Sequence, residues 1–152
     1  MRLLIQHVKE AKVCVGEKIV GTIGKGLLVF LGVHREDTLE DCLWLRDKLL
    51  HLRIFMDLQE KMNLSIQDVA GELLIVSQFT LYADCVKGRR PSFDLSAKSE
   101  LAKELYMRFI EEMQKHLAVV QTGEFGAHMQ VHLINDGPLT FILDSKNRVM
   151  NV

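Results

Sequence analysis

Two polar stretches are the strongest candidates for chemistry in this chain. The first is Ser77-Gln78-Phe79-Thr80, where a hydroxyl, an amide and a second hydroxyl come at the end of a run that begins at Glu72 and is mostly apolar. A rigid scaffold often presents binding residues at strand ends, and strand alternation predicts Gln78 and Thr80 on one side, opposite Ser77 and Phe79. Polar residues that only end a buried strand would give the same pattern. Both interpretations remain open.

The second stretch is Asn135-Asp136-Gly137-Pro138, which joins the expected strands 129–134 and 139–143. Its Asp-Gly pair predicts a hairpin turn, and proline is tolerated where a strand begins. The alternative is a cis Gly137–Pro138 bond, a form found in about 5–6% of X–Pro bonds in folded proteins. A cis bond would redirect the neighbouring carbonyls and could aim them at a bound group.

Other chemistries have little support in the sequence. Gly21, Gly24 and Gly26 precede an apolar strand instead of following one, so we expect turns and no phosphate-binding loop. His128 and His132 share a strand face but lie about 13 Å apart at ~3.3 Å per residue, too far for one metal ion. A solvated strand face explains them better, and we expect no metal and no cofactor.

Short strands and two helices must position these stretches. We expect strands at 2–8, 12–15, 18–23, 27–31 and 72–79. Asp37 with Glu40 three positions later predicts the start of a first helix, and an apolar stripe at helical spacing predicts a second over about 96–117. Clustered strands with two segregated helices are typical of an α+β fold with a largely antiparallel sheet. We expect one domain over residues 1–152.

Composition excludes several classes of function. The 152 residues carry 19 basic and 20 acidic side chains, a formal charge of −1, which is untypical of a protein that coats long nucleic acids. Its three cysteines are widely spaced, which favours a reducing compartment. No apolar run approaches the roughly 18 residues of a membrane span, and the amino terminus does not resemble a signal peptide. We expect a cytoplasmic protein with no membrane partner.

The motifs together resemble one family. Ser77-Gln78-Phe79-Thr80 and Asn135-Asp136-Gly137-Pro138-Leu139-Thr140 are similar to the two signature motifs of D-aminoacyl-tRNA deacylases. The similarity covers essentially the whole chain and includes three further motifs: Ile5-Gln6-x-Val8, Gly88-x-x-Pro91-Ser92-Phe93 and Phe125-Gly126-Ala127-x-Met129-Gln130-Val131. The animal paralogue that edits L-alanyl-tRNA carries a different segment in place of Ser77–Thr80, so it is the less similar relative.

The resemblance implies an ester hydrolase that releases D-amino acids from the 3′ end of tRNA and clears mischarged glycine. It implies a barrel-like homodimer in which Gly137-Pro138, in the cis form, enters the partner's active site as a chiral filter. Ser77, Gln78, Phe79 and Thr80 would line the pocket, with Gln78 and Thr80 as catalytic candidates. Phe125 and Met129 would contact the terminal adenosine.

The basic group Lys87, Arg89 and Arg90 stands close to the first motif and contains the best candidates for tRNA phosphates, with Lys25 a weaker one. A solvated loop would carry the same charges. A few basic contacts combined with stacking are common in recognition of unpaired RNA.

Two mechanisms fit the motifs. Thr80 as nucleophile lacks a neighbouring base in sequence, and an unactivated hydroxyl reacts poorly. We favour activation of water by the 2′-hydroxyl of the RNA, with stabilisation by backbone N–H groups near Phe79 and Thr80.

One residue departs from the family pattern, because His7 stands where family members typically carry arginine. If that arginine braces the Gly-Pro segment, histidine would hold the filter more loosely or in a pH-dependent way. Leu139 in place of the common valine is conservative. The rival functions are an RNA- or DNA-binding protein without activity, an esterase for another acyl group, and, less favoured, a nucleotide hydrolase.

Overall fold

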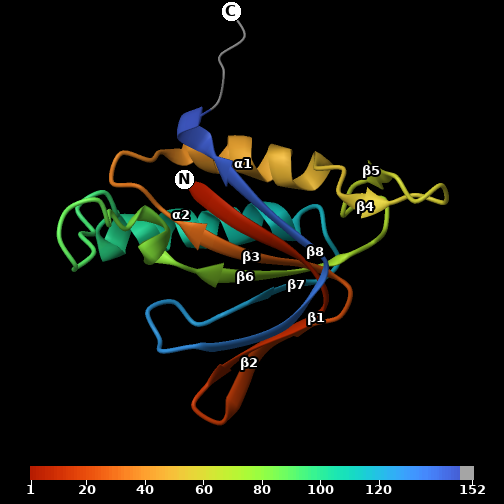
Figure 1. Ribbon diagram of the computed structural model, residues 1–152, viewed down its shortest axis with the longest axis horizontal. Coiled ribbons are helices and arrows are strands. Elements are labelled where there is room, and N and C mark those ends of the chain that lie inside the picture. Colours follow the sequence, from red (N-terminus) through yellow and green to blue (C-terminus); the bar gives the residue numbers. More distant parts are fainter. Residues whose placement is uncertain (148–152) are drawn as a thin grey trace, which may run out of the picture.

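The computed structural model describes residues 1–147; residues 148–152 of the expected domain lie outside the described part. Ten helices and strands and two 3₁₀ turns follow one another within residues 1–147: β1 (Arg2–Val15), β2 (Lys18–Ile23), β3 (Gly26–Gly32), α1 (Leu39–His51), β4 (Phe55–Met56), β5 (Met62–Leu64), β6 (Glu72–Ser77), η1 (Phe79–Tyr82), α2 (Ser99–Gln114), β7 (Val120–Thr122), β8 (Gln130–Asp144) and η2 (Ser145–Asn147). Figure 1 shows α1 and α2 on one side of a strongly curved sheet. The predicted α+β fold is confirmed.

The main sheet has the strand order β2-β1-β3-β6-β7, with β8 paired to β1. β1 is antiparallel to β2, β3 and β8, as predicted, but β3–β6 and β6–β7 are parallel. The reason is connectivity: α1 lies between β3 and β6, and α2 lies between β6 and β7, and a crossover through a helix returns the chain in the same direction. The sheet is therefore mixed.

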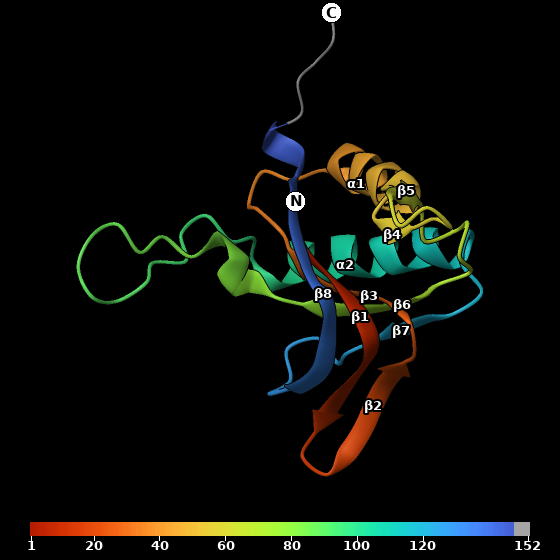
Figure 2. The ribbon, with the colours of Figure 1, turned by 45° about the vertical axis from the view of Figure 1, so that its right-hand side comes forward.

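The curved sheet nearly closes into a barrel (Figure 2). A Cβ atom added to Gly21 of β2 would lie 2.4 Å from the carbonyl oxygen of Thr122 in β7. The two edge strands thus approach so closely at this point that only glycine fits. Two separate apolar clusters result, one between the sheet and the helices and one inside the curve.

These two clusters explain the unbroken apolar run of β3. Leu27, Val29 and Leu31 pack with the helices, whereas Leu28 packs with the second cluster inside the curve. A strand covered on both faces needs apolar residues at successive positions. Every residue of this strand except the half-buried Phe30 is therefore buried, as the apolar sequence indicates.

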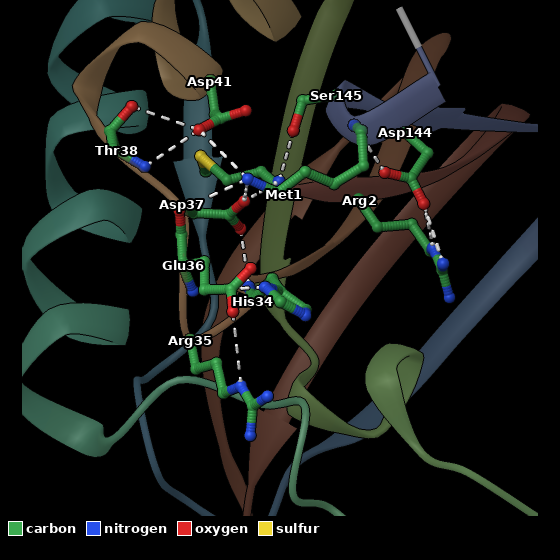
Figure 3. A network of polar contacts seen from close by, with 11 residues as sticks. Met1, Arg2, His34, Arg35, Glu36, Asp37, Thr38, Asp41, Asp144 and Ser145 are labelled. Atoms are coloured by element: carbon green, nitrogen blue, oxygen red, sulfur yellow. Dashed lines mark hydrogen bonds and ion pairs between the residues drawn. The ribbon is translucent and has the colours of Figure 1, made fainter.

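The first helix begins one residue later than predicted. Thr38 is its N-cap, and the Thr38 backbone N–H donates to the Asp41 carboxylate over 2.9 Å. Asp37 instead pairs with the buried Met1 ammonium at 2.6 Å and accepts from the His34 N–H at 2.6 Å (Figure 3). Burial lowers the pKa of that ammonium, although Asp37 opposes the shift. The second helix is shorter than expected and spans Ser99–Gln114.

The predicted hairpin at Asn135–Pro138 is wrong. β8 is one strand from Gln130 to Asp144, and both of its halves are antiparallel to the same strand β1. Asn135 pairs with Val8 and Thr140 with Gln6, so residues 136–139 leave the sheet opposite His7 and rejoin it. The two predicted strands 2–8 and 12–15 are likewise one strand, which is long enough to pair with both halves.

Within residues 1–147, no helix is long and apolar enough to cross a membrane.

Candidate active site

A pocket of about 450 Å³ lies where β3 and β6 end, between the first half of α2 and the segment before β8. Three of the predicted motif residues line it, Ser77, Gln78 and Phe79, together with Phe125 and Met129 from more than forty positions later. Apolar neighbours complete the walls: Leu31, Val33, Val76, Ala97, Ala102, Tyr106, Ala127 and Val131. The two distant motifs therefore meet in one cavity.

The chain turns sharply where β6 ends. Ser77 is the last strand residue, Gln78 is extended (φ −145°, ψ 83°), and Phe79–Tyr82 form the 3₁₀ turn η1. The predicted alternation of Gln78 and Thr80 on one side is therefore wrong, because strand geometry ends before either residue. The first N–H groups of a helical turn have no acceptor within it, and no hydrogen bond from the Phe79 or Thr80 N–H occurs among the described residues.

Gly32 allows η1 to lie against the sheet. A Cβ atom at Gly32 would be 3.0 Å from both the Gln78 carbonyl oxygen and the Leu81 Cβ, and 3.3 Å from the Tyr82 ring. The Gln78 N–H also donates to the Leu31 carbonyl over 2.8 Å. The turn is thus fixed on the end of β3, beside the pocket.

The hydroxyl of Thr80 has one side-chain partner within residues 1–147, the Gln78 amide, which donates to it. Thr80 itself is exposed and is absent from the residues that line the pocket. No histidine or carboxylate within the described part contacts its hydroxyl, so nothing there is placed to remove its proton. This arrangement does not activate Thr80 as a nucleophile.

Aromatic rings border the pocket on two sides. Phe79 is 56% exposed and packs edge-on against Phe93, with 4.9 Å between ring centroids. On the other side, Phe125 packs against Tyr106 at 5.6 Å. Exposed aromatic faces of this kind can stack with unpaired bases.

Tyr106 is a pocket residue that sequence reasoning assigned only to the core stripe of the second helix. Its hydroxyl donates to the Ile75 carbonyl over 2.9 Å, and burial raises the pKa of the phenol, so it stays protonated. His128 also lines the pocket, whereas His132 lies on β8. The spacing of apolar residues along the helix does not distinguish Tyr106 from a core residue, because its ring packs beneath the pocket at a position that faces the core.

Gly137 and Pro138 lie outside the pocket of their own chain. Their peptide bond is cis, Gly137 has φ +124°, and both residues are exposed. The Thr140 hydroxyl accepts hydrogen bonds from Asn135 (3.0 Å) and Gln6 (3.4 Å), which closes the base of the segment 136–139. The predicted filter residues are therefore presented to the outside of this chain.

Lys87, Arg89 and Arg90 lie on an exposed arm (Figure 2). Reciprocal backbone hydrogen bonds of 2.8 Å between Asp84 and Ser92 close its base. None of the three basic side chains makes an ion pair with another residue in the range 1–147. Their charges are free to meet an anionic ligand.

The comparisons with known proteins agree with these motifs. The family model described as D-Tyr-tRNA(Tyr) deacylase matches residues 4–144. The chain belongs to this family. A curated member from Thermotoga petrophila, named D-aminoacyl-tRNA deacylase, is 57% identical over 145 residues, covering 95% of this chain and 97% of that protein. One from Thermosipho africanus with the same name is 58% identical, covering 96% and 98%.

Two solved structures have the same architecture as this chain. One described as the c-Myc DNA Unwinding Element Binding Protein superimposes with a TM-score of 0.90 at 39% identity, covering 95% of this chain and 98% of that chain. A second, described as a probable eukaryotic D-amino acid tRNA deacylase, gives a TM-score of 0.79 at 21% identity and supports the fold alone. The barrel-like α+β prediction is consistent with both.

Within residues 1–147, no group of three or more His, Cys, Asp or Glu side chains is placed to hold a metal ion. The side chains that line the pocket include the Ser77 hydroxyl, the Gln78 amide, the His128 imidazole and the rings of Phe79, Tyr106 and Phe125.

Proposed function

We propose that this protein hydrolyses the ester bond of D-aminoacyl-tRNA, and of mischarged glycyl-tRNA, to release the free amino acid. The observation that carries this proposal is the single pocket that gathers Ser77, Gln78 and Phe79 with Phe125 and Met129 in a member of the deacylase family. Phe125 and Met129 would hold the terminal adenosine, and Ser77–Phe79 would face the aminoacyl ester. The substrate class is the one that the names of the curated relatives state.

The chiral filter in this proposal is Gly137-Pro138 of a second protomer. Both residues are exposed and lie away from their own pocket, which suits an insertion in trans. The carbonyls of this segment would hold the α-ammonium group, and the backbone would leave no room for an L side chain. Exclusion by shape rejects the wrong enantiomer while tolerating any D side chain.

A homodimer would also cover apolar surface close to this segment. Ile142 of β8 is 63% exposed, and it pairs with Leu4 of β1, which in turn pairs with Phe30 of β3. All three side chains are at least partly exposed in the single chain. A second copy that buries them would bring residues 136–139 of each chain toward its partner.

Water is the nucleophile in the proposed reaction. The 2′-hydroxyl of the terminal ribose assists attack of water on the ester carbonyl, the bond to the ribose 3′-oxygen breaks, and that oxygen takes up a proton. The backbone N–H groups of Phe79 and Thr80 have no acceptor among the described residues and would stabilise the developing oxyanion. In this proposal no covalent intermediate forms on the Thr80 hydroxyl.

The exposed arm would contact the tRNA beyond its last nucleotide. Lys87, Arg89 and Arg90 have no intramolecular ion pair in the described range, and the chain returns from the arm to Phe93, which packs on Phe79 beside the pocket. Phosphates near the 3′ end would therefore meet these cations. A cytoplasmic location follows from this proposed role in translation.

Release of amino acid from charged tRNA tests the reaction. D-tyrosyl-, glycyl- and L-alanyl-tRNA are each incubated with the protein, and free amino acid is measured against time. We expect release from the first two and little from the third. Release from L-alanyl-tRNA alone would assign the paralogous editing activity instead.

The alternative is nucleic-acid binding without hydrolysis, which the description of the 39% identical structural relative as a DNA unwinding element binding protein favours. That function predicts retention of charged tRNA with no release of amino acid in the same assay.

A further inference from the structure

Arg2 lies at the start of β1, where three segments of the chain meet. It pairs with Gly32 of β3 and with Asp144 of β8 in the sheet. Figure 3 shows its guanidinium turned toward Asp144, whose Oδ2 accepts from Arg2 Nε at 2.9 Å and from Nη2 at 2.7 Å. Two nitrogens bound to one carboxylate oxygen fix the plane of the guanidinium.

The remaining nitrogen of Arg2 holds the η1 turn. Its Nη1 donates to the Leu81 carbonyl oxygen over 2.6 Å, and the guanidinium carbon lies 4.6 Å from the centroid of the Tyr82 ring. A charged donor makes a shorter and stronger hydrogen bond than a neutral one. Arg2 thus attaches the turn that begins with Phe79 to the ends of β1 and β8.

Gly32 and Arg2 act on the turn together. The two residues are paired between β1 and β3 and therefore lie side by side. Because Gly32 has no side chain, Gln78 and Leu81 can approach the sheet closely. The turn is then held by Arg2 on one side and by the Gln78–Leu31 hydrogen bond on the other. Both contacts lie within a few residues of the exposed N–H groups of Phe79 and Thr80.

The planar fork of arginine is needed for this arrangement. Asp144 takes two of its donors and leaves a third aimed at Leu81. A lysine ammonium is a point charge at the end of a flexible stem and cannot fix both partners in one plane. Arg2→Lys therefore keeps the positive charge but removes the geometry.

We propose that Arg2 is a positioning residue for the reaction, which holds η1 so that the Phe79 and Thr80 N–H groups face the ester. This inference rests on the proposed function, because it assigns Arg2 a role in that same site. The contribution is to the transition state, because negative charge develops on the carbonyl oxygen there and is absent from the bound ester. A variant that loses the hydrogen bonds from Arg2 to Asp144 and Leu81 should therefore show a lower rate of hydrolysis with little change in its affinity for substrate.

The test compares Arg2→Lys and Asp144→Asn with Arg46→Lys as a matched control. Arg46 makes a similar part-buried ion pair, 2.7 Å from Glu112, but joins α1 to α2 away from the pocket. Hydrogen exchange of the peptide covering residues 78–83 is measured for each protein, together with the single-turnover rate and the KM for D-tyrosyl-tRNA.

We expect faster exchange in residues 78–83 for both Arg2→Lys and Asp144→Asn, and a rate lowered about tenfold or more with KM little changed, because small misplacement of catalytic groups is costly. Arg46→Lys should leave the exchange and the rate as in the wild type. A wild-type rate in Arg2→Lys with unchanged exchange in residues 78–83 overturns the inference while the proposed function stands. An inactive wild type overturns both, which distinguishes the two failures.

Discussion

His7 Nδ1 lies 3.3 Å from the backbone carbonyl oxygen of Asp136, so β1 contacts the segment that leaves β8 one residue before Gly137. The imidazole is buried, and its ring packs edge-on against Phe55 with 4.7 Å between centroids. The Asp136 carboxylate lies 3.8 Å from the same nitrogen and 3.7 Å from Lys9 Nζ. His7 therefore contacts the segment that carries the proposed filter.

His7→Arg should tighten this support. A guanidinium is longer than an imidazole and carries a permanent charge, so it donates a charge-assisted hydrogen bond to Asp136. We expect an intact fold by circular dichroism and a D/L ratio of hydrolysis rates that rises severalfold. An unchanged ratio in this variant would remove the idea that residue 7 braces the filter.

Gly137→Ala should disrupt the filter by backbone strain and by a clash. Gly137 has φ +124°, and an added Cβ would lie 2.7 Å from the Leu139 Cγ and 2.9 Å from the Leu139 nitrogen. Gly16→Ala is the matched control, since Gly16 has φ +58° with nothing within 4 Å. That control should lose about 1–2 kcal/mol of stability.

Activity separates the two glycine variants. Gly16→Ala should keep the wild-type D/L ratio, whereas Gly137→Ala should lose most D-tyrosyl-tRNA hydrolysis or gain hydrolysis of L-tyrosyl-tRNA. Equal D/L ratios in both variants would mean that residue 137 takes no part in discrimination.

Thr80→Ala should leave turnover near normal, because its hydroxyl has no base beside it among the described residues. A tRNA that ends in 2′-deoxyadenosine should instead be hydrolysed about a hundredfold more slowly or worse, the usual loss when a proton-transfer group is removed. Rates are compared under single-turnover conditions. A collapse of activity in Thr80→Ala with a normal rate on the deoxy substrate would reverse the assignment.

Arg89→Ala and Arg90→Ala should weaken tRNA binding without changing the rate at saturation. The binding constant falls as salt is added, and each lost phosphate contact should make the plot of log K against log salt less steep by about 0.7–0.9. Lys18→Ala, an exposed charge on β2, is the control and should leave the slope as it is. Salt titrations that give the same slope for all variants contradict a role of the arm in tRNA binding.

Glu112→Gln should lower the stability of the protein at neutral pH and make its stability depend less on pH in acid. The Lys115 hydrogen bond, together with the Arg46 contact, lowers the pKa of Glu112 from its ordinary 4.5 to about 2. Its contribution to stability is therefore complete above about pH 4.5 and is lost as the pH falls toward 2.

Melting temperatures between pH 2 and 7 measure this effect, with Glu111→Gln as the exposed control on the same helix. We expect Glu112→Gln to melt several degrees lower at pH 7, with the difference from wild type shrinking in acid. A constant difference at every pH would show that the carboxylate charge is not the cause.

The sequence predicted which segments form the site but not how the chain connects them. The family resemblance places Ser77–Thr80 in the pocket and Phe125 and Met129 at the terminal adenosine, and the structure brings Ser77–Phe79, Phe125 and Met129 into one cavity. The sequence does not predict the parallel pairing of β3 with β6, because an apolar run indicates a buried strand but not the strand with which it pairs. The α1 crossover decides the direction of β6.

Local signals also failed where tertiary contacts override them. The Asp136-Gly137 pair has the composition of a hairpin turn, yet β1 is long enough to pair with residues on both sides of it, so the chain bulges out and returns. Asp37 resembles a helix cap, but the Met1 ammonium takes it as an ion-pair partner. Arg2 gave no signal, since its role depends on a backbone carbonyl of Leu81.

We propose that this pocket hydrolyses the ester of one enantiomer and excludes the other by shape. The decisive measurement is single-turnover hydrolysis of D-tyrosyl-tRNA and L-tyrosyl-tRNA by the wild-type protein, side by side with the spontaneous rate. We predict rapid release of D-tyrosine and no release of L-tyrosine above the spontaneous rate. Equal release from both substrates, or from neither, would contradict the account.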